Sequence, residues 1–115
     1  MPSSAARVAP LAKAAAGDAA LPAIREAIRR EWKLRIAYLD GNGRRTQRAV
    51  WPFALGFFER VRVIAAWCEL RQGYRHFRTD RIVRIAVTET RYPRRRAAML
   101  KEWRAIEKIP DPAAA

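Results

Sequence analysis

Residues 34–52 read LRIAYLDGNGRRTQRAVWP and contain two strand-like segments around a turn. The first segment has an apolar or aromatic residue at every second position: Leu34, Ile36 and Tyr38. A period of two is typical of a β-strand with one buried face. Asp40-Gly41-Asn42-Gly43 then favours a tight turn, because Asp-Gly and Asn-Gly tolerate positive φ. We predict a β-hairpin whose second strand, 44–51, ends in a bend or an edge position at Pro52.

The sequence after the hairpin predicts three more short strands. An apolar stretch at 53–58 and a polar turn at Glu59-Arg60 lead into them. The three segments that favour strands are 61–70, 74–79 and 82–90. About five short strands with closely spaced turns are typical of a small antiparallel β-barrel.

Two helices are predicted to flank these strands. Residues 19–33 place apolar side chains at spacings of three and four, which indicates an amphipathic helix: Leu21, Ile24, Ala27, Ile28 and Trp32. Residues 94–108 favour a basic helix after Pro93. We therefore expect an α+β chain with a flexible leader at 1–18, a domain at 19–92, and a C-terminal helix and tail at 93–115.

The charge of the chain indicates an anionic partner. Its 115 residues include 24 Lys plus Arg against 11 Asp plus Glu, which gives a net charge of +13. Such a balance favours DNA, RNA, nucleotides or an anionic membrane surface, and the cations are mostly Arg, whose planar fork matches phosphate. A GC-rich genome would also enrich Arg and Ala without any functional cause.

Several function classes are disfavoured by the residues that the chain lacks. A single cysteine, Cys68, allows no disulfide within the chain, and with His76 as the only histidine a zinc site is not expected. No apolar stretch approaches the roughly 20 residues of a membrane span, and no signal peptide is evident, so we expect a cytoplasmic protein. No phosphate loop, nucleophile elbow or carboxylate pair indicates an enzyme, and no cofactor is expected.

The densest chemical signal lies at 75–81, RHFRTDR. On a strand, one face would carry Arg75, Phe77, Thr79 and Arg81, and the other His76, Arg78 and Asp80. Two guanidinium groups beside an aromatic ring suit an anion that carries a ring. Tyr38 and Arg48 could join this face across the sheet. The structural alternative is that Asp80 pairs with Arg78 or Arg81 and that Phe77 belongs to the core.

A family resemblance rests on four stretches of the chain. They are AI at 27–28 with LRIAYLD at 34–40, TQRAVWP at 46–52, VIAAWCELR at 63–71, and RHFRTDRI at 75–82. In order and spacing they resemble the WYL domain of bacterial transcriptional regulators. The resemblance implies an Sm-like, SH3-type five-stranded barrel preceded by a helix, and a ligand-sensing role. It implies a basic pocket at Tyr38, Arg48, Arg75, Phe77 and Arg81, with His76 and Arg78 nearby.

The chain departs from the family pattern at two places. The Trp-Tyr-Leu triad that names the family falls on Arg62-Val63-Ile64, where only the third position keeps its character. Family members typically carry an N-terminal helix-turn-helix, and the leader at 1–18 is too short for one. We therefore expect a stand-alone domain or a fragment of a longer regulator, with a homodimer or a separate DNA-binding protein as its partner.

Three functions follow as hypotheses. The first is a regulatory domain that senses a nucleic acid or a phosphate-bearing small ligand through Arg48, Arg75 and Arg81. The second is a sequence-tolerant binder of single-stranded DNA or RNA that uses diffuse charge. The third is a protein–protein adaptor whose interface would be the apolar stretch 53–58, if that stretch is exposed.

Overall fold

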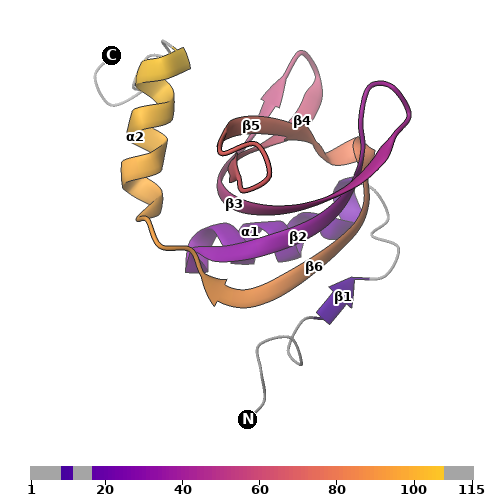
Figure 1. The fold of residues 1–115 in the computed structure, drawn as a ribbon, viewed down its shortest axis with the longest axis horizontal. Coiled ribbons are helices and arrows are strands. Elements are labelled where there is room, and N and C mark those ends of the chain that lie inside the picture. The colour runs from indigo at the N-terminus through magenta and orange to yellow at the C-terminus, as the bar shows by residue number, and fades with distance from the viewer. Residues whose placement is uncertain (1–8, 12–16, 108–115) are drawn as a thin grey trace.

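The computed structural model describes residues 9–11 and 17–107, and it confirms the α+β class (Figure 1). The elements in chain order are β1 (Ala9–Leu11), the 3-10 helix η2 (Gly17–Ala20), α1 (Leu21–Arg30), β2 (Trp32–Leu39), β3 (Arg45–Phe58), β4 (Val61–Cys68), β5 (Gly73–Arg78), the 3-10 helix η3 (Thr79–Arg81), β6 (Ile82–Arg91) and α2 (Arg96–Glu107). Most of the predicted leader and the C-terminal tail lie outside the described residues. No helix in the described ranges is long and apolar enough to cross a membrane.

The strands form one curved antiparallel sheet in the order β1-β6-β2-β3-β4-β5. The predicted closure into a barrel is wrong, because the hydrogen-bonded order runs from β1 to β5 without joining its ends. The chain crosses from β5 to β6 through η3, and β6 then pairs with β2 (Figure 1). The core of five longer strands flanked by α1 and α2 therefore matches the prediction except for its closure.

The helix α1 is shorter than the predicted 19–33 because Glu31 ends it. Glu31 adopts φ 62 and ψ 43, the left-handed conformation of a helix C-cap, and its N–H reaches the carbonyl oxygens of Ala27 and Ile28. Trp32 then begins β2. The predicted apolar stripe is confirmed at its first three positions, which are buried, while Ile28 and Trp32 are half-buried.

The strand β3 continues through Pro52, where a bend or an edge position was predicted. Its pairing with β4 shifts register between Pro52 and Ala54, so the irregularity is a bulge within an internal strand. A bulge tolerates the missing N–H of proline. The apolar stretch 53–58 is consequently the second half of a 14-residue strand.

Two apolar clusters lie on opposite faces of the sheet. The inner cluster joins α1 to the concave side and includes Ile24, Leu34, Ile36, Ile64, Phe77 and Ile85. The outer cluster joins α2 to β3, β4 and β5, and it is built around Phe53, Ala65, Tyr92 and Met99. The molecule therefore holds a helix on each side of one sheet.

Candidate functional site

Three of the predicted site residues meet on the concave side of the sheet. The rings of Tyr38 and Phe77 contact each other edge to face with centroids 5.1 Å apart. The guanidinium carbon of Arg48 lies 5.9 Å from the centroid of the Phe77 ring, within the range of a cation–π contact. We call Tyr38, Arg48 and Phe77 the arginine pocket. It brings β2, β3 and β5 to one place.

Arg48 is buried and forms no ion pair with the described residues. Its exposed fraction is 7%. Its Nε donates to Thr46 Oγ1 over 3.1 Å, and its Nη1 lies 3.6 Å from the sulfur of Cys68, which is itself buried. Because a buried charge is costly unless an opposite charge compensates it, this guanidinium favours an anion beside it.

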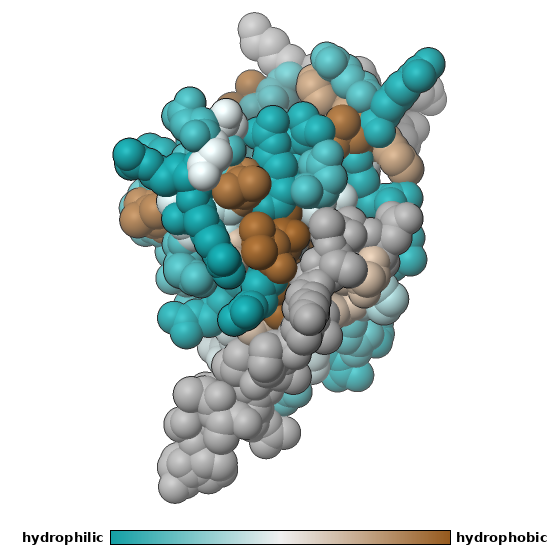
Figure 2. All heavy atoms as spheres, turned by 90° about the vertical axis from the view of Figure 1, so that its right-hand side faces the viewer, coloured by the Kyte–Doolittle hydropathy of each residue, from teal (hydrophilic) through white to brown (hydrophobic). Residues whose placement is uncertain are grey.

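Arg75 and Arg81 flank the arginine pocket from different elements, β5 and η3. Arg75 lies two residues before Phe77 on β5, hence on the same face, and is exposed. It makes no hydrogen bond or ion pair within the described ranges. The guanidinium of Arg81 lies over the β2–β3 turn, where a Cβ at Gly41 would be 3.6 Å from its Nη1. The side of the molecule that carries this turn is mostly hydrophilic (Figure 2).

For Arg78 and Phe77 the structural alternative holds. Arg78 Nη2 is 2.7 Å from Asp80 Oδ2, and this hydrogen-bonded ion pair lowers the pKa of the Asp80 carboxyl. The backbone N–H of Arg78 donates to the hydroxyl of Tyr38 over 3.0 Å. The Phe77 side chain is buried in the inner cluster. These contacts position the pocket, and they leave Arg48 and the flanking Arg75 and Arg81 without an ion pair within the described residues.

His76 lies on the opposite face of the sheet from the arginine pocket. Its Nε2 accepts a hydrogen bond from Trp103 Nε1 over 3.2 Å, and the two rings meet edge to face with centroids 5.5 Å apart. The predicted alternation along 75–81 placed His76 opposite Arg75 and Phe77, and the structure agrees. The structure therefore does not bring His76 together with the other predicted site residues.

Sequence reasoning missed a carboxylate that joins the two helices. Glu31 Oε1 lies 2.5 Å from Arg91 Nη2, and Glu31 Oε2 accepts the backbone N–H of Arg96 over 2.9 Å. These two hydrogen bonds, the one from Arg96 first, lower the pKa of Glu31. A glutamate just after an amphipathic helix carries no signal for such a role, because its partners come from the far end of the chain.

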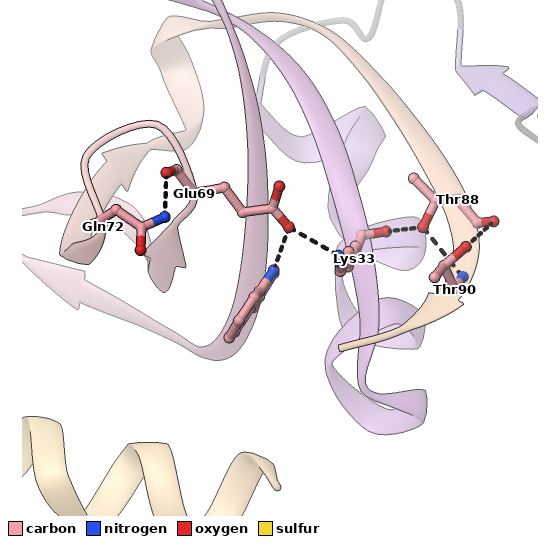
Figure 3. Close-up of polar contacts among 6 residues, drawn as sticks. Lys33, Glu69, Gln72, Thr88 and Thr90 are labelled. Atoms are coloured by element: carbon pink, nitrogen blue, oxygen red, sulfur yellow. Dashed lines mark hydrogen bonds and ion pairs between the residues drawn. The ribbon is translucent and has the colours of Figure 1, made fainter. Parts of the chain in front are cut away.

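A second polar cluster lies around Lys33 and Glu69 (Figure 3). Glu69 Oε2 is 2.9 Å from Lys33 Nζ and accepts the Trp51 Nε1 hydrogen over 2.7 Å. Partial burial raises the pKa of Glu69, but the bonds from Lys33 and Trp51 outweigh it and lower the pKa. The Lys33 carbonyl in turn accepts the Thr88 hydroxyl over 2.8 Å. Each charge is paired, so this cluster stabilises the sheet and offers no site.

A groove of 920 Å³ lies between α1 and α2 over the β3–β4 hairpin. Apolar residues of the stretch 53–58 line it, together with His76 and Trp103. Phe57 and Phe58 are 69% and 63% exposed, as the adaptor hypothesis required of this stretch. Within the described ranges no cluster of His, Cys, Asp and Glu could hold a metal ion.

Comparison with known proteins gives a family and a structural relative. Residues 19–87 match the family model of the WYL domain. Among solved structures, proteasome accessory factor B/C (PafBC) of Arthrobacter aurescens superposes with a TM-score of 0.60 and 29% sequence identity. The match covers 64% of this chain and 12% of that one, so the chain spans a small part of the relative's length. Curated protein sequences give no match, and the comparisons indicate no catalytic family.

Proposed function

The chain belongs to the WYL domain family, and we propose that it is a ligand-sensing domain of transcriptional control that binds a nucleic acid or a nucleotide at the arginine pocket. Occupancy of the pocket would alter a homodimer interface or a DNA-binding protein partner. The division into a domain at 19–92 and a C-terminal segment at 93–115 is part of this proposal. The family match ends at residue 87.

The buried guanidinium of Arg48 is the observation that carries the proposal. It is 7% exposed, contacts the Phe77 ring and forms no ion pair with the described residues. A phosphate next to Arg48 would compensate its charge through charge-assisted hydrogen bonds. Arg75 and Arg81 can supply further donors from the rim, and the net charge of +13 attracts the anion over a longer range.

The excess charge also supports a second candidate, a sequence-tolerant binder of single strands. Such a protein binds mainly through phosphate neutralisation, so its affinity falls steeply with salt and each Arg contributes a similar small share. A pocket instead concentrates the affinity in a few residues. The two candidates therefore differ in how unequally the arginines contribute.

We expect Arg75→Ala to weaken binding of a labelled single-stranded DNA of about 12 nucleotides by roughly tenfold. Arg81→Ala should act in the same direction, because both residues would contact the ligand's phosphates. Fluorescence anisotropy at two salt concentrations measures the affinities. Arg84→Ala is the matched control, since Arg84 is an exposed cation of β6 whose loss should change the affinity less than about twofold.

Equal losses in Arg75→Ala and Arg84→Ala, with affinity that vanishes at the higher salt, would favour diffuse binding and overturn the pocket. A further variant, Arg48→Met, removes the buried charge while it keeps most of the side-chain volume. Circular dichroism checks its fold before its affinity is compared. Repeating the titration with mononucleotides distinguishes a nucleotide from a strand.

A further inference from the structure

The groove between the helices has fixed walls. One wall is α1, with Arg25, Ile28 and Arg29, and the other is α2, with Leu100 and Trp103. Glu31 joins the end of α1 to the start of α2, because it accepts the Arg96 N–H and pairs with Arg91 on β6. The groove is therefore present before any partner arrives, which reduces the ordering entropy that binding costs.

The floor of the groove is apolar and ends in an exposed aromatic tip. Leu55 and Val63 lie within it, and Phe57 and Phe58 stand at the β3–β4 hairpin with 69% and 63% of their surfaces exposed. Two neighbouring exposed Phe rings beside an apolar groove are typical of a surface that a partner covers. His76 and Trp103, which hydrogen-bond to each other, close its inner side.

The rim of the groove is cationic. Arg25, Arg29, Arg96 and Arg104 line it with a single carboxylate, Glu107. Arg29 pairs with Glu26, whereas Arg25 makes no hydrogen bond or ion pair with the described residues. A second copy of this chain would bring a net charge of +13 against the same rim. Charge complementarity therefore favours an acidic partner.

Most of the aromatic rings that line the groove do not offer an open face on which bases could stack. Phe53 is fully buried and meets Tyr74 and Trp103 edge to face, with centroids 5.5 and 5.7 Å away. The guanidinium of Arg62 covers the Phe57 ring at 4.7 Å. Single strands bind largely by stacking on open ring faces. Apart from Phe58 and Trp103, the remaining apolar lining is aliphatic, which suits aliphatic side chains of a protein.

We propose that this groove binds an acidic amphipathic helix of a protein partner. Apolar residues on one face of that helix would fill the space between α1 and α2 over Leu55 and Phe57, and flanking carboxylates would meet Arg25 and Arg29. This is the helix-in-groove mode, in which anchors at i, i+3, i+4 and i+7 supply the contacts. None of the three residues of the arginine pocket lines this groove, so the two sites can be tested with separate variants.

The test uses the full chain and a fluorescein-labelled peptide of about 16 residues, which spans roughly 24 Å as a helix. The peptide carries Leu at the anchor positions and Glu beside them, and a scrambled peptide of identical composition is the control for diffuse charge. We expect the amphipathic peptide to bind at least about tenfold more tightly than the scrambled one.

The double variant Phe57→Ser/Phe58→Ser should lower the affinity for the amphipathic peptide by about tenfold or more, because it removes the exposed aromatic tip. Leu70→Ser is the matched control, since Leu70 is 63% exposed but lies outside the groove, and it should leave the affinity unchanged. Arg25→Glu should lower the affinity for the same peptide several-fold, while Arg84→Glu on β6 should change that affinity less.

Three results would overturn the proposal. Equal binding of both peptides would mean that charge alone attracts them. Self-association in analytical ultracentrifugation that Phe57→Ser/Phe58→Ser abolishes would make a second copy the occupant. Loss of single-stranded DNA binding in that double variant, without loss of peptide binding, would make the groove a nucleic-acid surface. None of these results depends on the outcome of Arg75→Ala, so this inference and the proposed function fail separately.

Discussion

Phe53→Ala is expected to lower the free energy of unfolding by about 3–5 kcal/mol. Phe53 is fully buried where α2 crosses β3, and its ring contacts Tyr74 and Trp103. Truncation removes this apolar area from the outer cluster and leaves a cavity between the helix and the sheet. Because α2 packs against the sheet through that cluster, we expect the helix to detach before the rest of the fold.

Phe57→Ala is the matched control for Phe53→Ala. The two residues belong to the same strand, but Phe57 is 69% exposed, so its truncation should change the stability by about 0.5 kcal/mol or less. Urea denaturation followed by circular dichroism measures both. A loss in Phe53→Ala as small as that in Phe57→Ala would show that the outer cluster does not stabilise the domain.

Glu31→Ala is expected to lower the free energy of unfolding by about 2–3 kcal/mol. The Glu31 side chain is 11% exposed and holds the Arg96 N–H and the Arg91 guanidinium. Its truncation leaves the backbone N–H of Arg96 without its acceptor and separates the two groove walls. The same variant should therefore also lower the affinity for the amphipathic peptide, although Glu31 does not line the groove.

The variant Glu31→Gly distinguishes the stability that the Glu31 side chain supplies from the cost of its backbone conformation. Glu31 has φ 62, a conformation that costs a non-glycine residue about 1 kcal/mol, so the Gly variant should be more stable than the Ala variant by that amount. Thermal denaturation of the two variants and the wild type measures the difference. Equal stability of Ala and Gly would contradict a strained cap.

The contribution of Glu31 should depend on pH in one direction. Folding lowers the pKa of Glu31 below its ordinary value of 4.5, so its stabilisation is fully present above that value and is lost as the pH falls through the folded pKa. The stability difference between wild type and Glu31→Ala should be constant near neutrality and shrink in acid. A difference that grows in acid would contradict the lowered pKa.

Local patterns predicted most of the fold. The hairpin turn is confirmed in detail: Asp40 Oδ1 accepts the N–H groups of Asn42 and Arg44, and Gly43 adopts φ 79. The apolar stripe of α1 and the turn at Glu59-Arg60 follow the sequence as closely, because their signals lie within a few residues. Closure of the sheet could not be predicted, since it depends on how η3 directs β6.

The C-terminal helix shows where a pattern loses accuracy. Its apolar residues in sequence include Ala98, Leu100, Trp103 and Ile106, but Met99 is the residue that is fully buried, while Ala98 and Ile106 are exposed. The basic helix has a weak apolar stripe, so its rotation is set by Phe53 and the outer cluster instead. Tertiary packing decides such cases.

The arginine pocket was predictable only in part, because strand alternation places some of its residues and the packing of distant elements places the others. Alternation along β5 placed Phe77 and Arg75 on one face of that strand. Pairing of the hairpin placed Tyr38 and Arg48 on one face of the β2–β3 pair. The strand ends at Arg78, however, so the position of Arg81 over Gly41 follows from η3 and not from alternation. The burial of Arg48 without an ion pair to the described residues could not be predicted, because it depends on the packing of β2, β3 and β5 together.

The position of β6 beside β2 makes the sheet depend on contacts between distant parts of the chain. The β2–β3 hairpin joins neighbours in sequence, so it closes a short loop at small entropic cost, whereas Tyr38 meets Ile82 only after β3, β4 and β5 have been laid down. The helix α2 follows β6 in the chain and packs through the outer cluster. The groove takes one wall from α2, whereas the arginine pocket takes its residues from β2, β3 and β5, so local detachment of α2 would open the groove and leave the pocket in place.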